Sequence, residues 1–289
     1  MNTRRTFLTA AGTTAMTLSM RHIVAEQVDD SYYKLALLSD SHIPADPFNE
    51  YRGFRPSENF VQVAKQVGDS TSQCALLCGD AARLEGKKED YEHLKKLIEP
   101  IQSKMRVEIA LGNHDDRTNF WSVFGKPERK SALDGKKHVT VADLGPQRWI
   151  VLDSLMYVDK VPGFLGAEQR DWLQKTLAAD STKPVFLMVH HTLGEGDGDL
   201  LDTDRLLSIA KQHSHVKGIV FGHSHKWNIV QKENLWWINL PAIGYNFNDE
   251  QPVGWVQAQL AARELKLTLH AVGGNRQDDN KSLSLSWSG

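Results

Sequence analysis

The sequence is poor in cysteine, in long apolar runs and in excess charge, and each scarcity excludes a class of protein. Its 289 residues contain only 2 cysteines, too few for the disulfide framework of a small secreted domain. No apolar run approaches the length that a bilayer-crossing helix needs. The formal net charge of −2 provides no basic footprint for nucleic acid. With 40% hydrophobic residues, the chain nevertheless has enough material for a folded core.

The two cysteines, Cys74 and Cys78, lie within one short apolar segment, QCALLCGD. Four residues along a strand separate two Cα atoms by roughly 13 Å, which is too far for a disulfide. The pair also lacks the partner ligands of a zinc site. We therefore expect two buried free thiols.

Three common catalytic motifs are missing as well. The sequence has neither the G-x-x-x-x-G-K-[ST] phosphate-binding loop nor the H-E-x-x-H motif of zinc proteases. The segment GHSHK, residues 222–226, differs from the G-x-S-x-G nucleophile elbow at its last position. These absences argue against a P-loop ATPase, a zinc protease of that type and a serine hydrolase.

The first residues have the layout of an export signal. A basic segment is followed by a weakly apolar stretch rich in Ala, Thr, Leu and Met, which ends in small residues near Ala25. The segment TRRTFL, residues 3–8, is similar to the twin-arginine signature S/T-R-R-x-F-L. We expect residues 1–25 to be a signal for the twin-arginine export machinery, and the protein to be exported to the periplasm or the extracellular space. The alternative is a disordered basic tail.

Short apolar runs that end in polar residues recur along the rest of the chain. One of them leads into ALGNHDD, residues 110–116. Four similar runs precede Asp40 and His42, Gly79 and Asp80, His190 and His191, and His223 and His225. Continuous apolar runs bounded by turn residues indicate strands that are buried on both faces.

The segments between these runs have the spacing of amphipathic helices. Apolar residues recur at helical intervals after Ser57, which we expect to be an N-cap. Residues 94–101 show the same spacing, and the segments that begin at Glu168 and Asp204 are two further candidates. Strands that alternate with helices predict an α/β fold. In such folds ligands gather beyond the carboxyl ends of the strands.

The polar residues at the strand ends have two interpretations. Asn and Asp are ordinary turn formers, so one cluster could simply close a strand. Five clusters built almost entirely from Asp, His and Asn favour a site instead. Carboxylate and imidazole ligands together suit Mn, Fe or Zn. Because there are too many candidate ligands for one ion, the pattern predicts two divalent or trivalent metal ions, an arrangement that clamps phosphoryl groups.

In their order along the chain, these motifs resemble those of the calcineurin-like metallophosphoesterases. The matching motifs are D-x-H at residues 40–42, G-D at 79–80, G-N-H-D at 112–115, His190, and G-H-x-H at 222–225. The resemblance implies an α/β domain over residues 32–272, built as a four-layer sandwich of two β-sheets flanked by helices. Residues 273–289 are expected to form a polar C-terminal tail.

The resemblance also implies a role for each matching residue. The expected ligands are Asp40, His42, Asp80 and His225 for one metal, and Asp80, Asn113, His190 and His223 for the other. A hydroxide that bridges the metals would attack phosphorus. His114 would stay off the metals and stabilise or protonate the departing oxygen. Asp115 would accept a hydrogen bond from the His114 imidazole and set its tautomer.

Finer motifs are similar to those of the class III cyclic nucleotide phosphodiesterase branch and its glycerophosphodiesterase relatives. They are Gly86 after the G-D motif, GNHDDR at residues 112–117, LDS at 152–154, and Leu165 with Glu168-Gln169 and Trp172-Leu173. The chain departs from this branch at Thr192-Leu193, where the relatives usually carry prolines. The departure leaves the substrate open.

Several residues near these motifs have a less specific pattern. We expect His191 and Asp153 to support the site, and Arg83 either to meet a phosphate oxygen or to be a solvated or ion-paired side chain. The acidic, glycine-rich segment 194–204 lacks EF-hand spacing and is expected to be a flexible loop at the site entrance. The aromatic residues of segment 45–56, with Trp227 and Tyr245, either shape the pocket or pack at the surface.

The sequence therefore predicts an exported dinuclear-metal phosphoesterase that hydrolyses a small phosphodiester. The first alternative is a phosphomonoesterase of the same family, because both reactions use this metal core. The second is a non-catalytic metal-binding protein. The presence of His114 disfavours the second alternative, because a binding module needs no acid for a leaving group.

Overall fold

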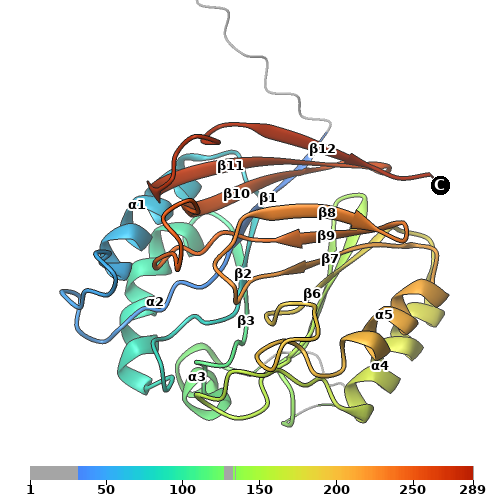
Figure 1. Ribbon diagram of the computed structural model, residues 1–289, viewed down its shortest axis with the longest axis horizontal. Helices are drawn as coiled ribbons and strands as arrows, with labels where there is room; N and C mark the ends of the chain where they lie inside the picture. Colours follow the sequence, from blue (N-terminus) through green and yellow to red (C-terminus); the bar gives the residue numbers. More distant parts are fainter. Residues whose placement is uncertain (1–31, 127–132, 134, 289) are drawn as a thin grey trace, which may run out of the picture. The chain divides into compact units, whose positions relative to one another are not determined.

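The computed structural model describes residues 32–126, 133 and 135–288 (Figure 1). The expected export signal, residues 1–25, lies outside this part of the chain. None of the helices in the described ranges combines the length and the apolar character that crossing a membrane requires.

The first sheet is mixed. In spatial order it contains β12 (Ser282–Ser286), β11 (Glu264–Gly274), β10 (Pro252–Leu260), β1 (Tyr33–Leu38), β2 (Cys74–Cys78) and β3 (Arg106–Ala110). The strands β1, β2 and β3 run parallel, with Leu35 opposite Cys74 and Cys74 opposite Arg106. Their carboxyl ends therefore lie at one edge of the sheet. The strands β10, β11 and β12 pair antiparallel on the other side of β1.

The second sheet is mixed as well. In spatial order it contains β4 (Thr140–Leu144), β5 (Gln147–Val151), β6 (Val185–Met188), β7 (Val216–Phe221), β9 (Leu235–Asn239) and β8 (Asn228–Lys232). The four central strands run parallel. Only the edge strands β4 and β8 pair antiparallel with their neighbours.

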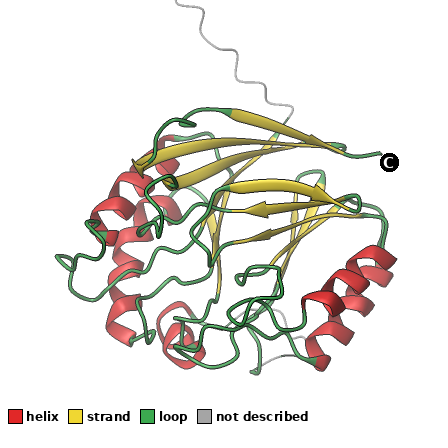
Figure 2. Cartoon of the chain, viewed as in Figure 1, coloured by secondary structure: helices red, strands yellow, loops and turns green. Residues whose placement is uncertain are grey.

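Five helices are found in the described residues, and four of them cover the outer faces of the sheets (Figure 2). They are α1 (Pro56–Asp69), α2 (Lys88–Gln102), α3 (Arg117–Phe124), α4 (Ala167–Ala179) and α5 (Thr203–Gln212). One apolar cluster packs α1 and α2 on the first sheet, and another packs α4 and α5 on the second. The predicted four-layer α/β sandwich is confirmed.

The core between the two sheets explains why the apolar runs are continuous. Leu76 of β2 faces this core together with Trp149 of β5 and Met188 of β6. The next residue of β2, Leu77, faces α1 and α2 instead. Because successive side chains of a strand point to opposite faces, a strand covered on both sides needs an apolar residue at nearly every position.

The structure corrects two local expectations. Ser57 is not the N-cap of α1, because the helix begins at Pro56 with Arg55 in the capping position, and proline is favoured at the first helical position. Residues 273–289 are not merely a polar tail, since β12 pairs with β11. Its alternating sequence SLSLS places Leu285 in the core between the sheets. The two cysteines are free and buried, as predicted.

Candidate metal centre

The loops that follow the parallel strands of both sheets are joined by backbone hydrogen bonds. Within the first sheet, Asp40 N donates to Gly79 O at 3.2 Å, and His42 N donates to Asp80 O at 2.9 Å. Between the sheets, Gly244 N, in the loop after β9, donates to Asp40 O at 2.9 Å. The strand ends therefore form one continuous edge. We call the seven predicted ligands on it the metal edge: Asp40, His42, Asp80, Asn113, His190, His223 and His225.

Five residues of the metal edge have a backbone conformation that side chains other than glycine seldom adopt. Their φ angles lie in the left-handed region, at 50° for Asp40, 46° for His42, 46° for Asp80, 67° for His223 and 53° for His225. Such conformations cost about 1–3 kcal/mol each and persist where the surrounding structure enforces them, often at functional sites. In this conformation, the side chains of all five residues belong to the groups of candidate ligands described below.

The glycines of two motifs are required by the close approach of ligand side chains. A Cβ atom at Gly112 would collide with the Asp80 carboxylate, and a Cβ atom at Gly222 would collide with Ser39 and the Asp40 carboxylate. Glycine is needed where another group approaches the backbone this closely. In the G-N-H-D and G-H-x-H motifs, the glycine therefore leaves room for the carboxylate of another predicted ligand. The residue directly after the glycine is itself a predicted ligand.

The side chains of the metal edge form overlapping clusters. Within the described residues, candidate ligand atoms lie within 4.8 Å of one another in three groups: Asp40, His42 and His225; His42, Asp80 and His114; and Asp80, His190 and His223. His42 and Asp80 each belong to two groups. The overlap links the three groups through His42 and Asp80 into one continuous set of candidate ligands.

The side-chain atoms within these groups are suited to bind cations. Nε2 of His42 and Nε2 of His225 are 3.0 Å apart. His225 Nε2 also lies 3.4 Å from Asp40 Oδ1, and His190 Nε2 lies 3.3 Å from Asp80 Oδ2. All of these residues are at most 2% exposed. Buried carboxylates and imidazoles at such distances are typically paired or coordinate a metal.

The hydrogen bonds on the far side of each ring leave one nitrogen available. His190 Nδ1 contacts Cys78 O at 2.8 Å, and His225 Nδ1 contacts Tyr245 O at 2.6 Å. A carbonyl oxygen only accepts a hydrogen bond, so Nδ1 carries the proton, and Nε2 of each ring in its neutral form is unprotonated and can serve as a ligand. In the described part of the chain, His190 Nε2 and Asn113 Oδ1 are buried without a hydrogen-bond partner. These unsatisfied atoms fit a bound metal.

The charges at the site also favour a bound cation. Burial opposes ionisation of Asp40, but the neighbouring His225 outweighs it and lowers the pKa of the carboxyl to about 2. Burial lowers the pKa of His42 to about 3 and that of His223 to about 4, so both rings are neutral at pH 7. Burial also disfavours a charged His190, yet the Asp80 carboxylate raises the pKa of that ring to about 10. The negative potential at Asp80 therefore favours a cation beside it.

The structure brings together the six Asp and His residues of the metal edge, and it places His114 next to them. For Asn113, the seventh residue, the structure shows a buried side-chain oxygen. The His114 ring lies 5.3 Å from the His42 ring, centroid to centroid, and the His114 backbone N–H donates to Asp80 Oδ1 at 2.9 Å. His114 Nδ1 contacts Leu84 O at 2.8 Å. Nε2 is the nitrogen that remains available on this ring, which is partly exposed.

The expected contact between Asp115 and the His114 imidazole is not found, and that expectation was wrong. The Asp115 carboxylate is fully buried and turned away from the ring. It accepts backbone N–H groups from Ala81, Ala82 and Gly112, and the hydroxyl of Tyr91 at 2.9 Å. Consecutive residues of a tight turn point in different directions, so adjacency in sequence does not bring these side chains together. Asp115 fixes the backbone of the G-D and G-N-H-D loops instead.

Outside the metal edge, the carboxylate of Asp159 also lies close to His114, and sequence reasoning missed it. Its Oδ1 lies 3.4 Å from His114 Nδ1. Its backbone N–H donates to Asn113 O at 2.8 Å. Asp159 belongs to the loop between β5 and α4, and the segment MYVDKVPG carries no motif that marks it as part of the site.

Several finer motifs meet in a second buried cluster, the Asp153 cluster, which consists of Asp153, Arg117, His138 and Gln169. Arg117 forms two hydrogen bonds of 2.7 Å with the Asp153 carboxylate. The backbone N–H of His138 donates to the same carboxylate, and Gln169 bonds both the N–H and the carbonyl of Asp153. These contacts connect GNHDDR, LDS and Glu168-Gln169. They show a structural role for the finer motifs, in agreement with the supporting role expected of Asp153.

The acidic segment 194–204 is anchored more firmly than expected. Gly198 O contacts His223 Nε2 at 3.0 Å, which places the segment beside the metal edge. Asp202 is buried, pairs with Arg170 and accepts the N–H groups of Leu165 and Gly166. Asp202 therefore holds the loop in place instead of lining an entrance.

Aromatic side chains form one wall beside the metal edge. The Tyr245 ring lies 4.8 Å from the His42 ring and 4.8 Å from that of Tyr51. Tyr51 and Phe247 are 40% and 49% exposed. Arg83 lies over the Tyr51 ring at 5.2 Å, and no ion pair within the described ranges involves it. Trp227 differs from these residues, because it packs against the core between the sheets.

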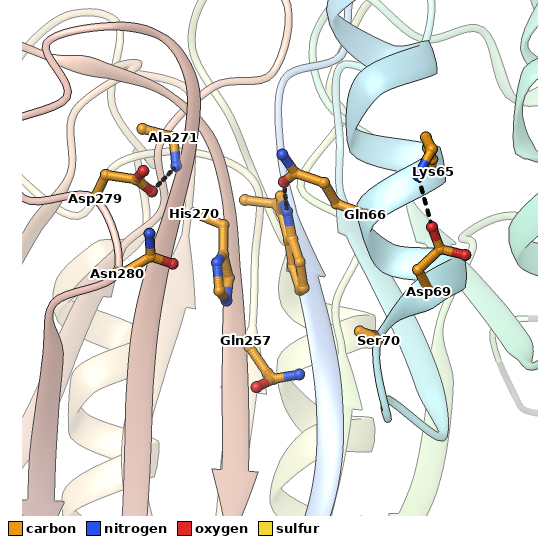
Figure 3. Close-up of a pocket in the computed structure, with 10 residues that line it drawn as sticks. Lys65, Gln66, Asp69, Ser70, Gln257, His270, Ala271, Asp279 and Asn280 are labelled. Atoms are coloured by element: carbon orange, nitrogen blue, oxygen red, sulfur yellow. Dashed lines mark hydrogen bonds and ion pairs between the residues drawn. The ribbon is translucent and has the colours of Figure 1, made fainter. Parts of the chain in front are cut away.

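A cavity of about 330 Å³ lies elsewhere, on the outer face of the first sheet beside α1 (Figure 3). Its wall includes Trp255, which stacks on His270 at 4.5 Å and donates to Gln66 Oε1 at 2.8 Å. No residue of the metal edge lines it. This cavity is therefore separate from the metal edge.

Comparison with known proteins assigns the family. The family model of the calcineurin-like phosphoesterases matches residues 33–227. The chain belongs to this family. It is a metal-dependent phosphoric ester hydrolase, and the Asp and His side chains of the metal edge form its metal-binding site.

Relatives of known name include cyclic nucleotide phosphodiesterases. A probable cyclic nucleotide phosphodiesterase of a Synechococcus species is 28% identical over 236 residues, covering 78% of this chain and 87% of the relative. The 3′,5′-cyclic-nucleotide phosphodiesterase of a Nostoc species is 24% identical, covering 83% and 88% of the two chains.

Solved structures share the fold at low sequence identity. A dimetal phosphatase from Danio rerio superimposes with a TM-score of 0.71 at 14% identity, covering 90% of this chain and all of the other. A purple acid phosphatase from yellow lupin superimposes with a TM-score of 0.64 at 19% identity, covering 89% of this chain and 54% of the other.

Proposed function

We propose that this protein hydrolyses a small phosphodiester with the help of two metal ions. The observation that carries the proposal is the set of overlapping clusters that are linked through His42 and Asp80. A first ion would be held by Asp40, His42, Asp80 and His225, and a second by Asp80, Asn113, His190 and His223. When bound, such a pair supplies Lewis-acid stabilisation of phosphoryl oxygens and lowers the pKa of a water molecule. Mn, Fe and Zn all suit this donor set.

The residues of the chain itself would orient the substrate and manage the proton. His114 lies beside the shared carboxylate with Nε2 available, so it can protonate the oxygen that leaves phosphorus. Arg83 carries a charge without a carboxylate partner in the described residues and can contact a phosphate oxygen at the mouth of the site. Tyr51 and Phe247 provide apolar surface for one ester group of the substrate.

A diester is favoured over a monoester because the relatives of known name are cyclic nucleotide phosphodiesterases. The aromatic wall supports the same choice, since a diester carries a second organic group that needs a surface. Cyclic nucleotides and glycerophosphodiesters are the small diesters to test first.

The experiment compares hydrolysis of bis(p-nitrophenyl) phosphate and p-nitrophenyl phosphate by residues 26–289 in Mn²⁺, with Asp80→Asn as the control. A clear preference for the diester supports the proposal. A preference for the monoester moves the assignment to a phosphatase of the same family. Absence of turnover with metal bound favours a non-catalytic metal-binding protein.

We also propose that the protein is exported by the twin-arginine route. The support is the sequence of residues 1–25 alone, with its basic start and weakly apolar middle. The mass of the protein recovered from the cell envelope tests the proposal. A mass that includes the first 25 residues, or recovery only from the cytoplasm, contradicts it.

A further inference from the structure

Exposed apolar side chains are concentrated on the loops that surround the metal edge. In the described ranges ten large apolar residues are exposed, and eight of them lie on the loops that follow β1, β2, β5, β6 and β9. The other two are Val61 on α1 and Leu283 on β12. Single exposed apolar residues are ordinary, whereas their concentration in one region marks a surface that binds a ligand or a partner.

Four of the eight residues are tied to the metal edge by contacts, and we call them the apolar rim: Tyr51, Leu84, Val161 and Phe247. The aromatic part of the rim lies beside the first group of candidate ligands. The Phe247 ring is 4.3 Å from the His225 ring, centroid to centroid. The Tyr51 ring packs against Tyr245, which packs against His42.

The aliphatic part of the rim lies beside His114 and the remaining ligands. The Leu84 carbonyl contacts His114 Nδ1 at 2.8 Å, which places this residue next to the expected acid. A Cβ atom at Gly198 would collide with Val161, so the two residues are in direct contact. Gly198 O in turn contacts His223 Nε2 at 3.0 Å. Apolar surface therefore accompanies the metal edge at both of its ends.

The occupant of this surface follows from covalent geometry. The organic groups of a phosphodiester are bonded to the phosphorus that the metal ions would hold, so they must lie on the surface next to the metal edge. An alkyl group on Leu84 and Val161 removes apolar area from water, which strengthens binding. A glycerol or ribose group would place hydroxyls against these aliphatic side chains, where they find no hydrogen-bond partner.

We infer that the substrate is an amphiphilic phosphodiester in which one ester group is an alkyl group, and that Leu84 and Val161 determine this specificity. The inference rests on the proposed phosphodiester hydrolysis and narrows its substrate class. The aromatic part of the rim is left for the second ester group. Full burial of a methylene group improves binding about 4-fold, and a half-exposed surface should give about 2-fold.

The test measures kcat/KM of the metal-loaded protein for methyl, butyl and hexyl 4-nitrophenyl phosphate. The leaving group is the same in all three esters, so differences between them report only the alkyl group. At about 2-fold for each methylene group, kcat/KM should rise about 30-fold from the methyl to the hexyl ester. Equal values for the three esters overturn the inference.

The rim variant combines Val161→Ser with Leu84→Asn. Asparagine suits the second position because the backbone of Leu84 is left-handed, with a φ of 52°. The matched control combines Val61→Ser with Leu283→Asn, far from the metal edge. Val61 and Val161 are both 54% exposed, and Leu283 and Leu84 are 47% and 48% exposed.

The rim variant should lose most of the dependence on alkyl length, and the control should keep it. The ratio between the hexyl and the methyl ester is the quantity compared, because a general loss of activity or folded protein cancels from it. Equal ratios in the rim variant and the control overturn the assignment of Leu84 and Val161.

A membrane surface is the competing occupant of the rim. Sedimentation with phosphatidylcholine vesicles tests it. Retention of the unaltered protein on vesicles, lost in the rim variant and accompanied by equal rates for the three esters, assigns the rim to a membrane and overturns the inference.

A binding measurement separates this inference from the proposed function. Calorimetry compares dihexyl phosphate with dimethyl phosphate on the metal-loaded protein, and it requires no turnover. Tighter binding of dihexyl phosphate, reduced in the rim variant and kept in the control, is expected. If the unaltered protein hydrolyses none of the esters, the proposed function fails, and this comparison decides the role of the rim. Equal binding of the two phosphates then overturns that role as well.

Discussion

The metal edge and the Asp153 cluster are both buried groups of polar side chains at the carboxyl ends of strands, yet they differ in how their polar atoms are satisfied. The Asp153 carboxylate has two hydrogen bonds from Arg117 and others from backbone N–H groups. At the metal edge, His190 Nε2 and Asn113 Oδ1 have no hydrogen-bond partner among the described residues, and five residues have left-handed backbones. A satisfied cluster connects parts of the fold, whereas an unsatisfied and strained one is prepared for a ligand.

The largest effect should come from Asp80→Asn. The substitution keeps the shape of the side chain and removes the charge that both centres share, so metal binding and catalysis should fail together. We expect kcat/KM for bis(p-nitrophenyl) phosphate to fall at least about 1,000-fold, the upper range for loss of one catalytic electrostatic group. The measurement is steady-state kinetics with metal analysis. Retained activity with two metals bound would refute the sharing of Asp80.

The Asp153 cluster should respond in stability instead of metal content. Asp153→Ala leaves the Arg117 guanidinium, which is 20% exposed, without its buried partner, and should lower the free energy of unfolding by about 3–5 kcal/mol. Asp143→Ala is the matched control. It breaks another Asp–Arg pair, in which the Asp143 side chain is 47% exposed, and should cost less than about 1 kcal/mol.

Urea unfolding of both variants measures this difference, and metal analysis of the folded protein completes the comparison. The Asp153→Ala protein that remains folded should bind as much metal as the unaltered chain. Equal stability losses for the two variants, or a specific loss of metal from Asp153→Ala, would remove the distinction between the two clusters.

The smallest effect concerns the thiols behind the metal edge. Burial raises the pKa of Cys74 to about 11, and burial with the nearby Asp40 and Asp80 carboxylates raises the pKa of Cys78 well above its ordinary value. The thiolate is the reactive form, so at pH 8 only about one Cys74 thiol in a thousand is reactive. Ellman's reagent should detect no fast thiol in the native protein and both after unfolding. Rapid modification of Cys78 in the folded protein would mean that the strand behind the metal edge opens.

The ligands could be predicted from sequence because each follows directly on a strand. Parallel strands bring their carboxyl ends to one edge, so Asp40, Asp80 and His190 are placed by the order of the elements alone. Asp159 could not be predicted, since it reaches His114 through a loop whose course depends on a hydrogen bond to Asn113. The predicted contact between Asp115 and the His114 imidazole was wrong because the side chains of these consecutive residues point in different directions.

The strand β12 shows a second limit of the sequence. Its five residues contain only two leucines among serines, and a polar segment of this kind indicates an exposed tail. Its place in the sheet is decided by the free edge of β11 and by the gap in the core that Leu285 fills. Such tertiary context overrides local preference.

The central claim is that the metal edge holds two ions that share Asp80. Anomalous diffraction from crystals of Mn²⁺-loaded protein tests it most directly. We predict two peaks, one among Asp40, His42 and His225 and the other among Asn113, His190 and His223, both in contact with the Asp80 carboxylate. A single peak, or two peaks of which only one touches Asp80, would contradict the claim.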